Sequence, residues 1–347
     1  MSFMQLTLLY CLLIFFAGDQ ASEYSPSSET KIVEPTKEAE ATNIILQSKD
    51  GGQTWQDISH GLPETEQRVG FYAGASEVYL STNDVLYSSK SNLKTPVWEK
   101  ENVPDPRNTS IHFYRSGVMA YSYDGQVYQK KPSSETWLPI YPNFKSHSVA
   151  TFFEASDGTV FFSTGKNFFK STDKARSWKL VQKGWVGDIV EAEGVLLATG
   201  QKGIMRSTDN GEHWEWVISE GGVGIAIERI DGGFAAISYD KGTQSRRIRT
   251  SFDGGKTWQA IDEGLSPSLN ISSVKQMGSD LFVGHPDGIF RSSDMGKTWH
   301  RVHAGFGNVL HTSKFVSLNS APAPVEKVFK LYVSGNVLYA VAVTPGC

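Results

Sequence analysis

The sequence predicts an all-β chain of seven four-stranded antiparallel sheets arranged in a ring. Seven of the nine tryptophans, from Trp55 to Trp299, recur at intervals of 36 to 44 residues. Each interval holds four short runs rich in Val, Ile, Phe and Tyr, separated by Gly, Asp and Asn, without helical periodicity. The two ends of the repeat region each hold half of such an interval. Four-stranded repeats of about 40 residues are typical of β-propellers and not of helical solenoids.

The chain begins with two segments that we expect to lie outside the propeller. Residues 1–22 contain an apolar run from Leu6 to Ala17, which is too short for a membrane span and is typical of a signal peptide. Residues 23–42 hold almost no large apolar side chains and are predicted to form a disordered lead-in. Residues 43–347 are predicted to form the propeller. We therefore expect a secreted or periplasmic protein without a membrane span.

The repeat region divides into six complete periods and two halves. NIILQSKDGGQTWQDI at the N-terminal end supplies a third and a fourth strand, and VFKLYVSGNVLYAVAVT at the C-terminal end supplies a first and a second. Joined, the two halves make a seventh blade that closes the ring. The complete periods end near Trp98, Trp137, Trp178, Trp214, Trp258 and Trp299.

One turn motif recurs in five periods, as SKDGGQTW, STDKARSW, STDNGEHW, SFDGGKTW and SSDMGKTW. Gly suits the positive φ of a tight turn, although Ala175 replaces it in one copy. The Asp can accept hydrogen bonds from turn N–H groups, and the Ser can support the same turn. The Trp can bury roughly 150–250 Å² against a neighbouring sheet. We expect these residues to be structural: Asp50, Trp55, Asp173, Trp178, Asp209, Trp214, Asp253, Trp258, Asp294 and Trp299.

The pattern S-x-D-x-G-x-x-W resembles the Asp-box, or BNR, repeat. Similar hairpins occur in sialidases, sortilin-type receptors, two-propeller xyloglucanases, some polysaccharide lyases and the photosystem II assembly factor. The resemblance covers nearly all of residues 43–347 and implies a β-propeller. It implies no particular activity, because the motif lies on a structural turn away from the usual ligand-binding face.

Charge and composition exclude several classes of function. The formal net charge is −4 with acids and bases interleaved, which gives no basic face for nucleic acid. Cys11 lies in the predicted signal peptide, so Cys347 alone cannot form an internal disulfide. The eight histidines are scattered without metal-ligand spacing. We expect a monomer that binds no metal and uses no cofactor.

The candidate ligand-binding face lies opposite the repeated turn, where loops lead into the innermost strands. Asp188 and Glu220 are placed near the starts of neighbouring inner strands, which makes them weak candidates for a catalytic carboxylate pair of the kind that cleaves glycosidic bonds. The candidates for ligand binding are Arg68, His112, His147, Trp185, Tyr239, Glu326 and Lys327.

Two functions are compatible with this sequence. Sialidase activity is disfavoured, because Arg246, Arg247 and Arg249 crowd one predicted strand instead of converging on a substrate carboxylate, and because the Arg-Ile-Pro motif of that family is absent. The preferred hypothesis is a non-catalytic binding or assembly scaffold for a protein or glycan. The alternative is a glycoside hydrolase or polysaccharide lyase that acts on extracellular polysaccharide.

Overall fold

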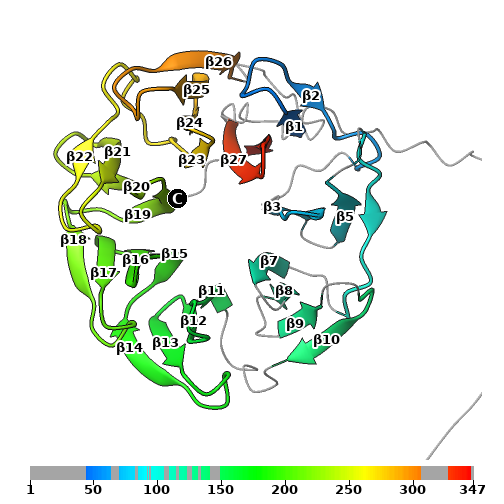
Figure 1. Ribbon diagram of the computed structural model, residues 1–347, viewed down its shortest axis with the longest axis vertical. Helices are drawn as coiled ribbons and strands as arrows, with labels where there is room; N and C mark the ends of the chain where they lie inside the picture. The colour runs from blue at the N-terminus through cyan, green and yellow to red at the C-terminus, as the bar shows by residue number, and fades with distance from the viewer. Residues whose placement is uncertain are drawn as a thin grey trace, which may run out of the picture. The chain divides into compact units, whose positions relative to one another are not determined.

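The computed structural model describes residues 44–63, 70–82, 85–91, 93, 95–104, 109–114, 117–122, 127–131, 134–140, 149–305 and 327–344. Within these residues the strands form seven four-stranded antiparallel sheets, and there are no helices. The sheets are arranged as blades around a common centre (Figure 1). The predicted all-β, seven-bladed propeller is thus confirmed. The predicted signal peptide and lead-in, residues 1–42, lie outside the described residues.

Six blades consist of four consecutive strands, which follow one another from the centre of the ring outward. Blade 1 contains β3 (Gly70–Ala73), β4 (Glu77–Ser81), β5 (Leu86–Lys90) and β6 (Glu99–Lys100). Blade 2 contains β7 (Thr109–Tyr114), β8 (Gly117–Ser122), β9 (Val127–Lys130) and β10 (Trp137–Ile140). Blade 3 contains β11 (Val149–Glu154), β12 (Val160–Thr164), β13 (Asn167–Ser171) and β14 (Lys179–Lys183). Blade 4 contains β15 (Val186–Ala192), β16 (Val195–Gly200), β17 (Gly203–Ser207) and β18 (Glu215–Ile218). Blade 5 contains β19 (Gly224–Ile230), β20 (Gly233–Asp240), β21 (Ser245–Ser251) and β22 (Gln259–Ala260). Blade 6 contains β23 (Ser273–Met277), β24 (Asp280–His285), β25 (Gly288–Ser292) and β26 (His300–Ala304).

Both ends of the propeller contribute to blade 7. Its strand order is β2-β1-β28-β27, with β1 at Ile45–Ser48, β2 at Gln56–Asp57, β27 at Val328–Ser334 and β28 at Val337–Val343. In the antiparallel pairing of β1 with β28, Ile45 lies opposite Val341 and Ser48 lies opposite Leu338. The N-terminal half therefore supplies the two outer strands and the C-terminal half the two inner ones, as the sequence predicts.

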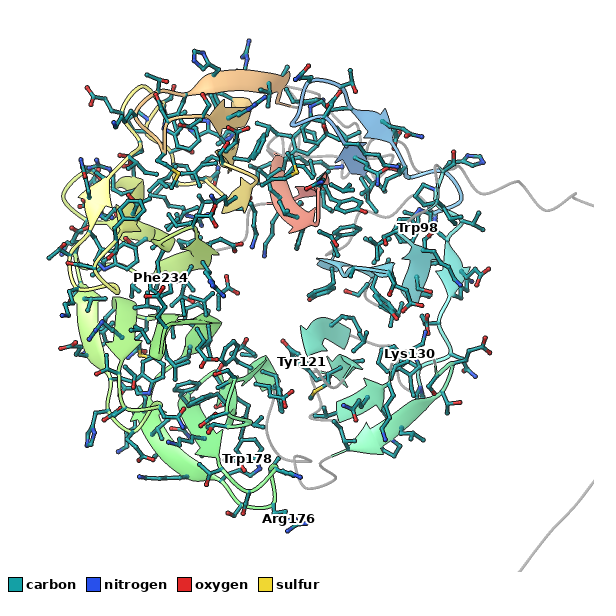
Figure 2. All side chains as sticks on the ribbon, viewed as in Figure 1. Trp98, Tyr121, Lys130, Arg176, Trp178 and Phe234 are labelled. Carbon is teal, nitrogen blue, oxygen red and sulfur yellow. The ribbon has the colours of Figure 1, made fainter. Side chains whose placement is uncertain are left out.

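The apolar core is divided among the interfaces between neighbouring blades. Each of the seven buried clusters found in the described residues draws on two adjacent blades. At one interface, for example, Ile237 and Ile248 of blade 5 pack against Leu281 and Val283 of blade 6. Figure 2 shows the side chains that fill the spaces between the blades. A blade is therefore buried on both of its faces, which explains why a second strand such as GFAAISYD lacks regular polar alternation.

The Asp-box turn has the hydrogen bonds that its sequence predicts. In blade 5 the Ser251 hydroxyl donates to Asp253 Oδ1 at 2.8 Å and accepts from the amide of Gly255 at 3.0 Å. Asp253 also accepts from the amides of Lys256 at 3.0 Å and Thr257 at 2.9 Å. The corresponding Ser-to-Asp hydrogen bonds form in the other four copies. These bonds favour the ionised carboxylate, so each motif aspartate has a lowered pKa.

The repeated tryptophans join one blade to the one before it. Trp214 follows the turn of blade 4, and its ring packs edge-on against Phe161 and Phe168 of blade 3, with centroids 6.4 and 5.5 Å away. Trp258 of blade 5 likewise packs on the cluster that contains Leu197 of blade 4. Its indole N–H donates to the carbonyl of Gly255 at 3.1 Å, which ties the ring to its own turn. The predicted packing against a neighbouring sheet is confirmed at these positions.

The antiparallel order gives the ring two distinct faces. Each Asp-box turn joins the third strand of a blade to the fourth, at the same end as the turn between its first and second strands. We call this end the Asp-box face. The opposite end, which we call the loop face, carries the connections between blades and the turns between second and third strands. The inner strands begin at the loop face, where the sequence places the candidate ligand-binding residues.

Candidate functional site

Three of the predicted binding residues lie in the described part of the loop face. Trp185 directly precedes β15, Lys327 directly precedes β27, and Tyr239 is near the end of β20. His112 belongs to β7, but its side chain is outside the described residues. Arg68, His147 and Glu326 also lie outside the described residues.

Two aromatic side chains are held against glycines of the loop face. A Cβ added to Gly187 would lie 2.8 Å from ring atoms of Trp185, and one added to Gly222 would lie 2.1 Å from Cδ1 of Tyr239. Each ring therefore rests directly on backbone that carries no side chain. Trp185 and Tyr239 are half-buried and belong to the neighbouring blades 4 and 5. Both aromatic groups are thus presented on rigid elements of this face.

Glu220 is engaged in a structural ion pair. It lies in the loop before β19 and pairs with Arg249 on β21 of the same blade. Arg249 also donates to the hydroxyl of Ser238 at 2.9 Å and lies 3.5 Å from Asp240. Because only 8% of the Arg249 side chain is exposed, Glu220 balances a largely buried guanidinium. This role differs from that of one member of a catalytic pair with Asp188.

The other two arginines of β21 are also used within the scaffold. Arg247 makes a two-pronged contact with Asp262, through Nε at 2.6 Å and Nη2 at 2.8 Å. Arg246 donates to the carbonyl of Ile271 at 2.8 Å. Arg246 and Arg247 therefore bind blade 5 to the loop that leads into blade 6, which supports the structural interpretation of the arginine cluster.

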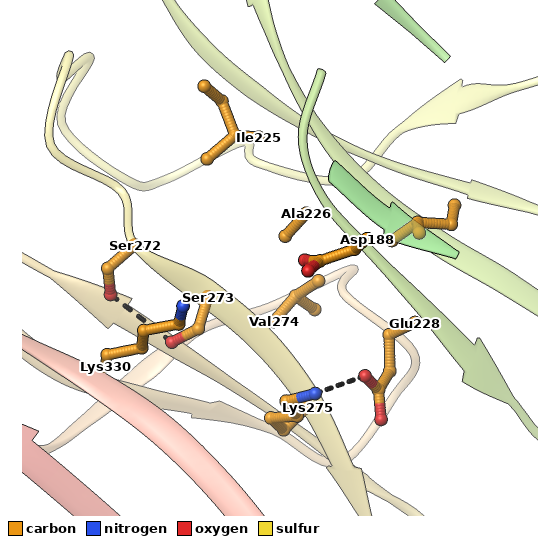
Figure 3. Close-up of a pocket in the computed structure, with 10 residues that line it drawn as sticks. Asp188, Ile225, Ala226, Glu228, Ser272, Ser273, Val274, Lys275 and Lys330 are labelled. Carbon is orange, nitrogen blue, oxygen red and sulfur yellow. Dashed lines mark hydrogen bonds and ion pairs between the residues drawn. The ribbon is translucent and has the colours of Figure 1, made fainter. Parts of the chain in front are cut away.

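Asp188 faces a small polar cavity formed by the inner strands of blades 4 to 7. Its other charged lining residues are Glu228 on β19, Lys275 on β23 and Lys330 on β27 (Figure 3). The cavity holds about 40 Å³. We call this site the inner-strand pocket. Its remaining lining is aliphatic or hydroxylic: Ile225, Ala226, Ile227, Ser272, Ser273 and Val274.

The four charged groups of the inner-strand pocket are not equivalent. Lys275 forms an ion pair with Glu228, and their side chains are 27% and 24% exposed. Burial raises the pKa of Glu228, an effect that Lys275 opposes and the nearby charge of Asp188 reinforces. Asp188 and Lys330 are exposed. Within the described residues neither of them forms an ion pair, although the Lys330 ammonium lies 5.9 Å from the ring centroid of Tyr332.

Sequence reasoning did not identify Glu228, Lys275 or Lys330. It concentrated on residues where the inner strands begin, whereas these three lie within those strands. A usable signal is nevertheless present, because charged residues interrupt apolar runs: Glu228 and Arg229 in GIAIERI, and Lys330 in VFKLYVS.

The described residues contain no group of three or more His, Cys, Asp or Glu side chains that could hold a metal ion. The same part of the chain has no helix with the length and apolar character needed to cross a bilayer.

Comparison with known proteins supports the fold. Residues 249–260 match the BNR/Asp-box repeat family. The recurring turn is an Asp-box. The structure of YCF48 bound to D1 peptide has 16% identity and a TM-score of 0.53, and the match covers 71% of this chain and 83% of that one. A catalytically inactive virginiamycin B lyase from Staphylococcus aureus with quinupristin has 14% identity and a TM-score of 0.55, over 81% of this chain and 97% of the lyase.

An ancestral GH74 enzyme has 13% identity and a TM-score of 0.57, and the match covers 86% of this chain but only 45% of the enzyme. No curated protein matches the sequence. At these identities the solved structures share the propeller fold and nothing finer. They include a peptide-binding protein and enzymes, so the fold alone selects neither function.

Proposed function

We propose that this chain is an exported, non-catalytic binding or assembly scaffold that holds a protein or glycan partner on its loop face. The observation that carries the proposal is that Glu220, one of the two candidate catalytic carboxylates, is engaged in an ion pair within the scaffold. Glu220 pairs with Arg249, and the arginines of β21 are committed to contacts within the scaffold. The groups that remain accessible on this side are suited to recognition: half-buried aromatic rings and the exposed charges of Asp188 and Lys330.

Rigidity also supports a binding role. Trp185 and Tyr239 are each placed against a glycine, so little side-chain freedom is lost when a partner covers them. Aromatic side chains on a preorganised surface contribute strongly to protein and glycan interfaces. The structure of YCF48 bound to D1 peptide provides a precedent for peptide binding by a propeller of this general form.

The experiment is to incubate the purified chain with a panel of extracellular polysaccharides and peptides, measuring binding and product formation separately. Binding without turnover is the expected result. Trp185→Ala should weaken that binding by about tenfold or more if the ring is a main contact. Phe252→Ala is the matched control, because Phe252 is 58% exposed on the Asp-box face. Turnover that disappears with Asp188→Asn or Glu220→Gln would instead establish the alternative carbohydrate-active enzyme.

Export is tested separately by N-terminal sequencing of the mature protein from its native host. Loss of a segment of about 22 residues is expected from the apolar run that precedes the lead-in. An intact N-terminus on intracellular protein would contradict export and leave the binding proposal to be judged by the panel.

A further inference from the structure

The charges of the inner-strand pocket specify what it can bind. Glu228 and Lys275 neutralise each other through their ion pair. The groups left over are one carboxylate, on Asp188, and one ammonium, on Lys330, and within the described residues neither forms an ion pair. Figure 3 shows Asp188 and Lys330 entering the pocket from different sides, carried by β15 and β27. A ligand with a single charge would satisfy only one of these two groups.

The size of the pocket limits the ligand further. A volume of about 40 Å³ corresponds to roughly three water molecules, at about 10–15 Å³ of such volume for each. A small charged head group fits this space. Among the described residues, none of those that line the pocket is aromatic, so none offers a ring on which a sugar could stack. A neutral glycan also carries no charge to pair with Asp188 or Lys330.

The backbone around the pocket is held in place before any ligand binds. The amide of Asp188 donates to the Thr199 hydroxyl at 2.9 Å, which fixes β15 against β16. The Ser273 hydroxyl accepts from the amide of Leu331 at 2.9 Å, which joins β23 to β27 across the blade interface. Asp188 and Lys330 are therefore carried by strands that are each anchored to a neighbouring strand, as preorganised recognition requires.

We propose that the inner-strand pocket binds a zwitterionic group of the amino-acid type, with the ligand ammonium on Asp188 and its carboxylate on Lys330. This inference rests on the proposed function, and it favours an amino acid or a peptide as the ligand over a neutral glycan. The same chemistry is offered by a free amino acid and by neighbouring Lys and Glu side chains of a docked peptide. The experiment distinguishes these two sources.

The test is isothermal titration of the purified full chain with defined probes. Glycine represents the free amino acid, and the capped dipeptide acetyl-Lys-Glu-amide represents a paired side-chain source. Ethylamine and acetate each supply only one of the two charges. Saturable binding is expected for at least one zwitterionic probe, with at least tenfold weaker binding of ethylamine and acetate, since each lacks one charge-assisted contact. Preference for glycine or for the dipeptide identifies the source.

Matched variants test the two contacts. Asp188→Asn and Lys330→Met should each weaken binding of the zwitterion by tenfold or more. Asp231→Asn and Lys256→Met make the same chemical changes on the Asp-box face and should leave binding unchanged. The double charge exchange Asp188→Lys with Lys330→Asp should recover binding relative to Asp188→Lys alone, because the ligand can reverse its orientation. A role confined to folding would not produce such recovery.

Three results would overturn the inference: no saturable binding of either zwitterion, equal affinity for the singly charged probes, or binding that is indifferent to Asp188→Asn and Lys330→Met. The proposed function is judged by different measurements, because Trp185-dependent binding of a polysaccharide or peptide needs no zwitterion. If that binding is found while the pocket takes none of the probes, the inference fails and the scaffold function stands.

Discussion

Substitution of Gly296 by alanine tests whether the Asp-box turns press against the preceding blade. Gly296 has a φ of +90°, and an added Cβ would lie 2.7 Å from Cβ of Ile261, an atom that cannot move without its backbone. Gly264 is the matched control, because its φ is +86° and an added Cβ would meet nothing within 4 Å. The two positions share the backbone conformation and differ in the contact.

The expected losses of stability follow from the backbone conformation and from the contact with Ile261. An L-residue in the left-handed region costs about 1–2 kcal/mol, and the reduced freedom of the unfolded chain returns about 0.4–1 kcal/mol. Gly264→Ala should therefore lower the free energy of unfolding by about 1 kcal/mol. Overpacking adds about 1–3 kcal/mol, so Gly296→Ala should lower it by about 2–4 kcal/mol.

The assay is urea unfolding monitored by tryptophan fluorescence. If the dependence of the unfolding free energy on urea concentration is the same for each variant, a shift in the midpoint reports a change in stability. Ala175→Gly should act in the opposite direction, because Ala175 has a φ of +60° at the position where the other copies hold glycine. Equal losses for Gly296→Ala and Gly264→Ala would refute the described contact between the Asp-box turn of blade 6 and Ile261 at the end of blade 5.

Three further predictions concern packing, closure and acid stability. Trp258→Ala should lower the free energy of unfolding by about 3–5 kcal/mol. Trp216 is not one of the regularly spaced tryptophans, so Trp216→Ala should lower it clearly less. Equal losses in urea unfolding would contradict the assignment of the repeat. A chain ending at Pro324 lacks β27 and β28, so it should be aggregation-prone in size-exclusion chromatography, and a stable monomer would disprove closure by blade 7. Hydrogen bonds from the Thr54 hydroxyl and amide lower the pKa of Asp50 to about 2, below the unfolded value of about 3.9. The stabilisation that ionised Asp50 contributes should be complete above about pH 5 and be lost as the pH falls toward about 2. Asp50→Asn lacks this carboxylate, so its urea midpoint should change less between about pH 5 and about pH 2 than the midpoint of the unmodified chain.

The fold was predictable because the propeller repeats its local chemistry. Every intact Asp-box fixes a turn through hydrogen bonds between residues at most four positions apart, such as the bond that the Gly255 amide donates to the Ser251 hydroxyl, so the motif alone specifies the geometry. The spacing of the tryptophans then gives the blade length. Closure followed from counting strands, because an N-terminal half-blade has an obvious complement at the C-terminal end.

The site was less predictable because its contacts join distant parts of the chain. Lys275 meets Glu228 across 47 positions, and Arg249 meets Glu220 across 29. Neither pairing leaves a local pattern. The sequence correctly places Asp188 and Glu220 near the starts of inner strands, but it cannot show that Glu220 is drawn toward the third strand of its own blade. Which charges remain unpaired is therefore a property of the assembled ring.

A contact between blades extends the Asp-box motif by one residue. Arg206 directly precedes the motif serine of blade 4, and its Nε donates to the carbonyl of Gly254 in the turn of blade 5 at 2.7 Å. Lys170 of blade 3 donates in the same way to Asn210 of blade 4 at 2.8 Å. Arg291 of blade 6 reaches Gly51 of blade 7 at 3.3 Å. In three interfaces a cation before the serine thus satisfies a turn carbonyl of the following blade.

Arg206→Met should show whether this contact couples the blades. Methionine retains much of the apolar stem but removes two donors, Nε to Gly254 and Nη1 to Glu215 of the same blade. The pair with Glu215 contributes little, because the Glu215 side chain is 67% exposed. Because only 9% of the Arg206 side chain is exposed, water replaces the bond to Gly254 poorly. The expected loss is about 1.5–3 kcal/mol of unfolding free energy, the usual contribution of a hydrogen bond from a charged group. Arg176→Met is the control, since Arg176 is exposed on an Asp-box turn, and it should change stability by less than about 0.5 kcal/mol. If both variants unfold at the same urea concentration, the cation before the serine does not couple neighbouring blades.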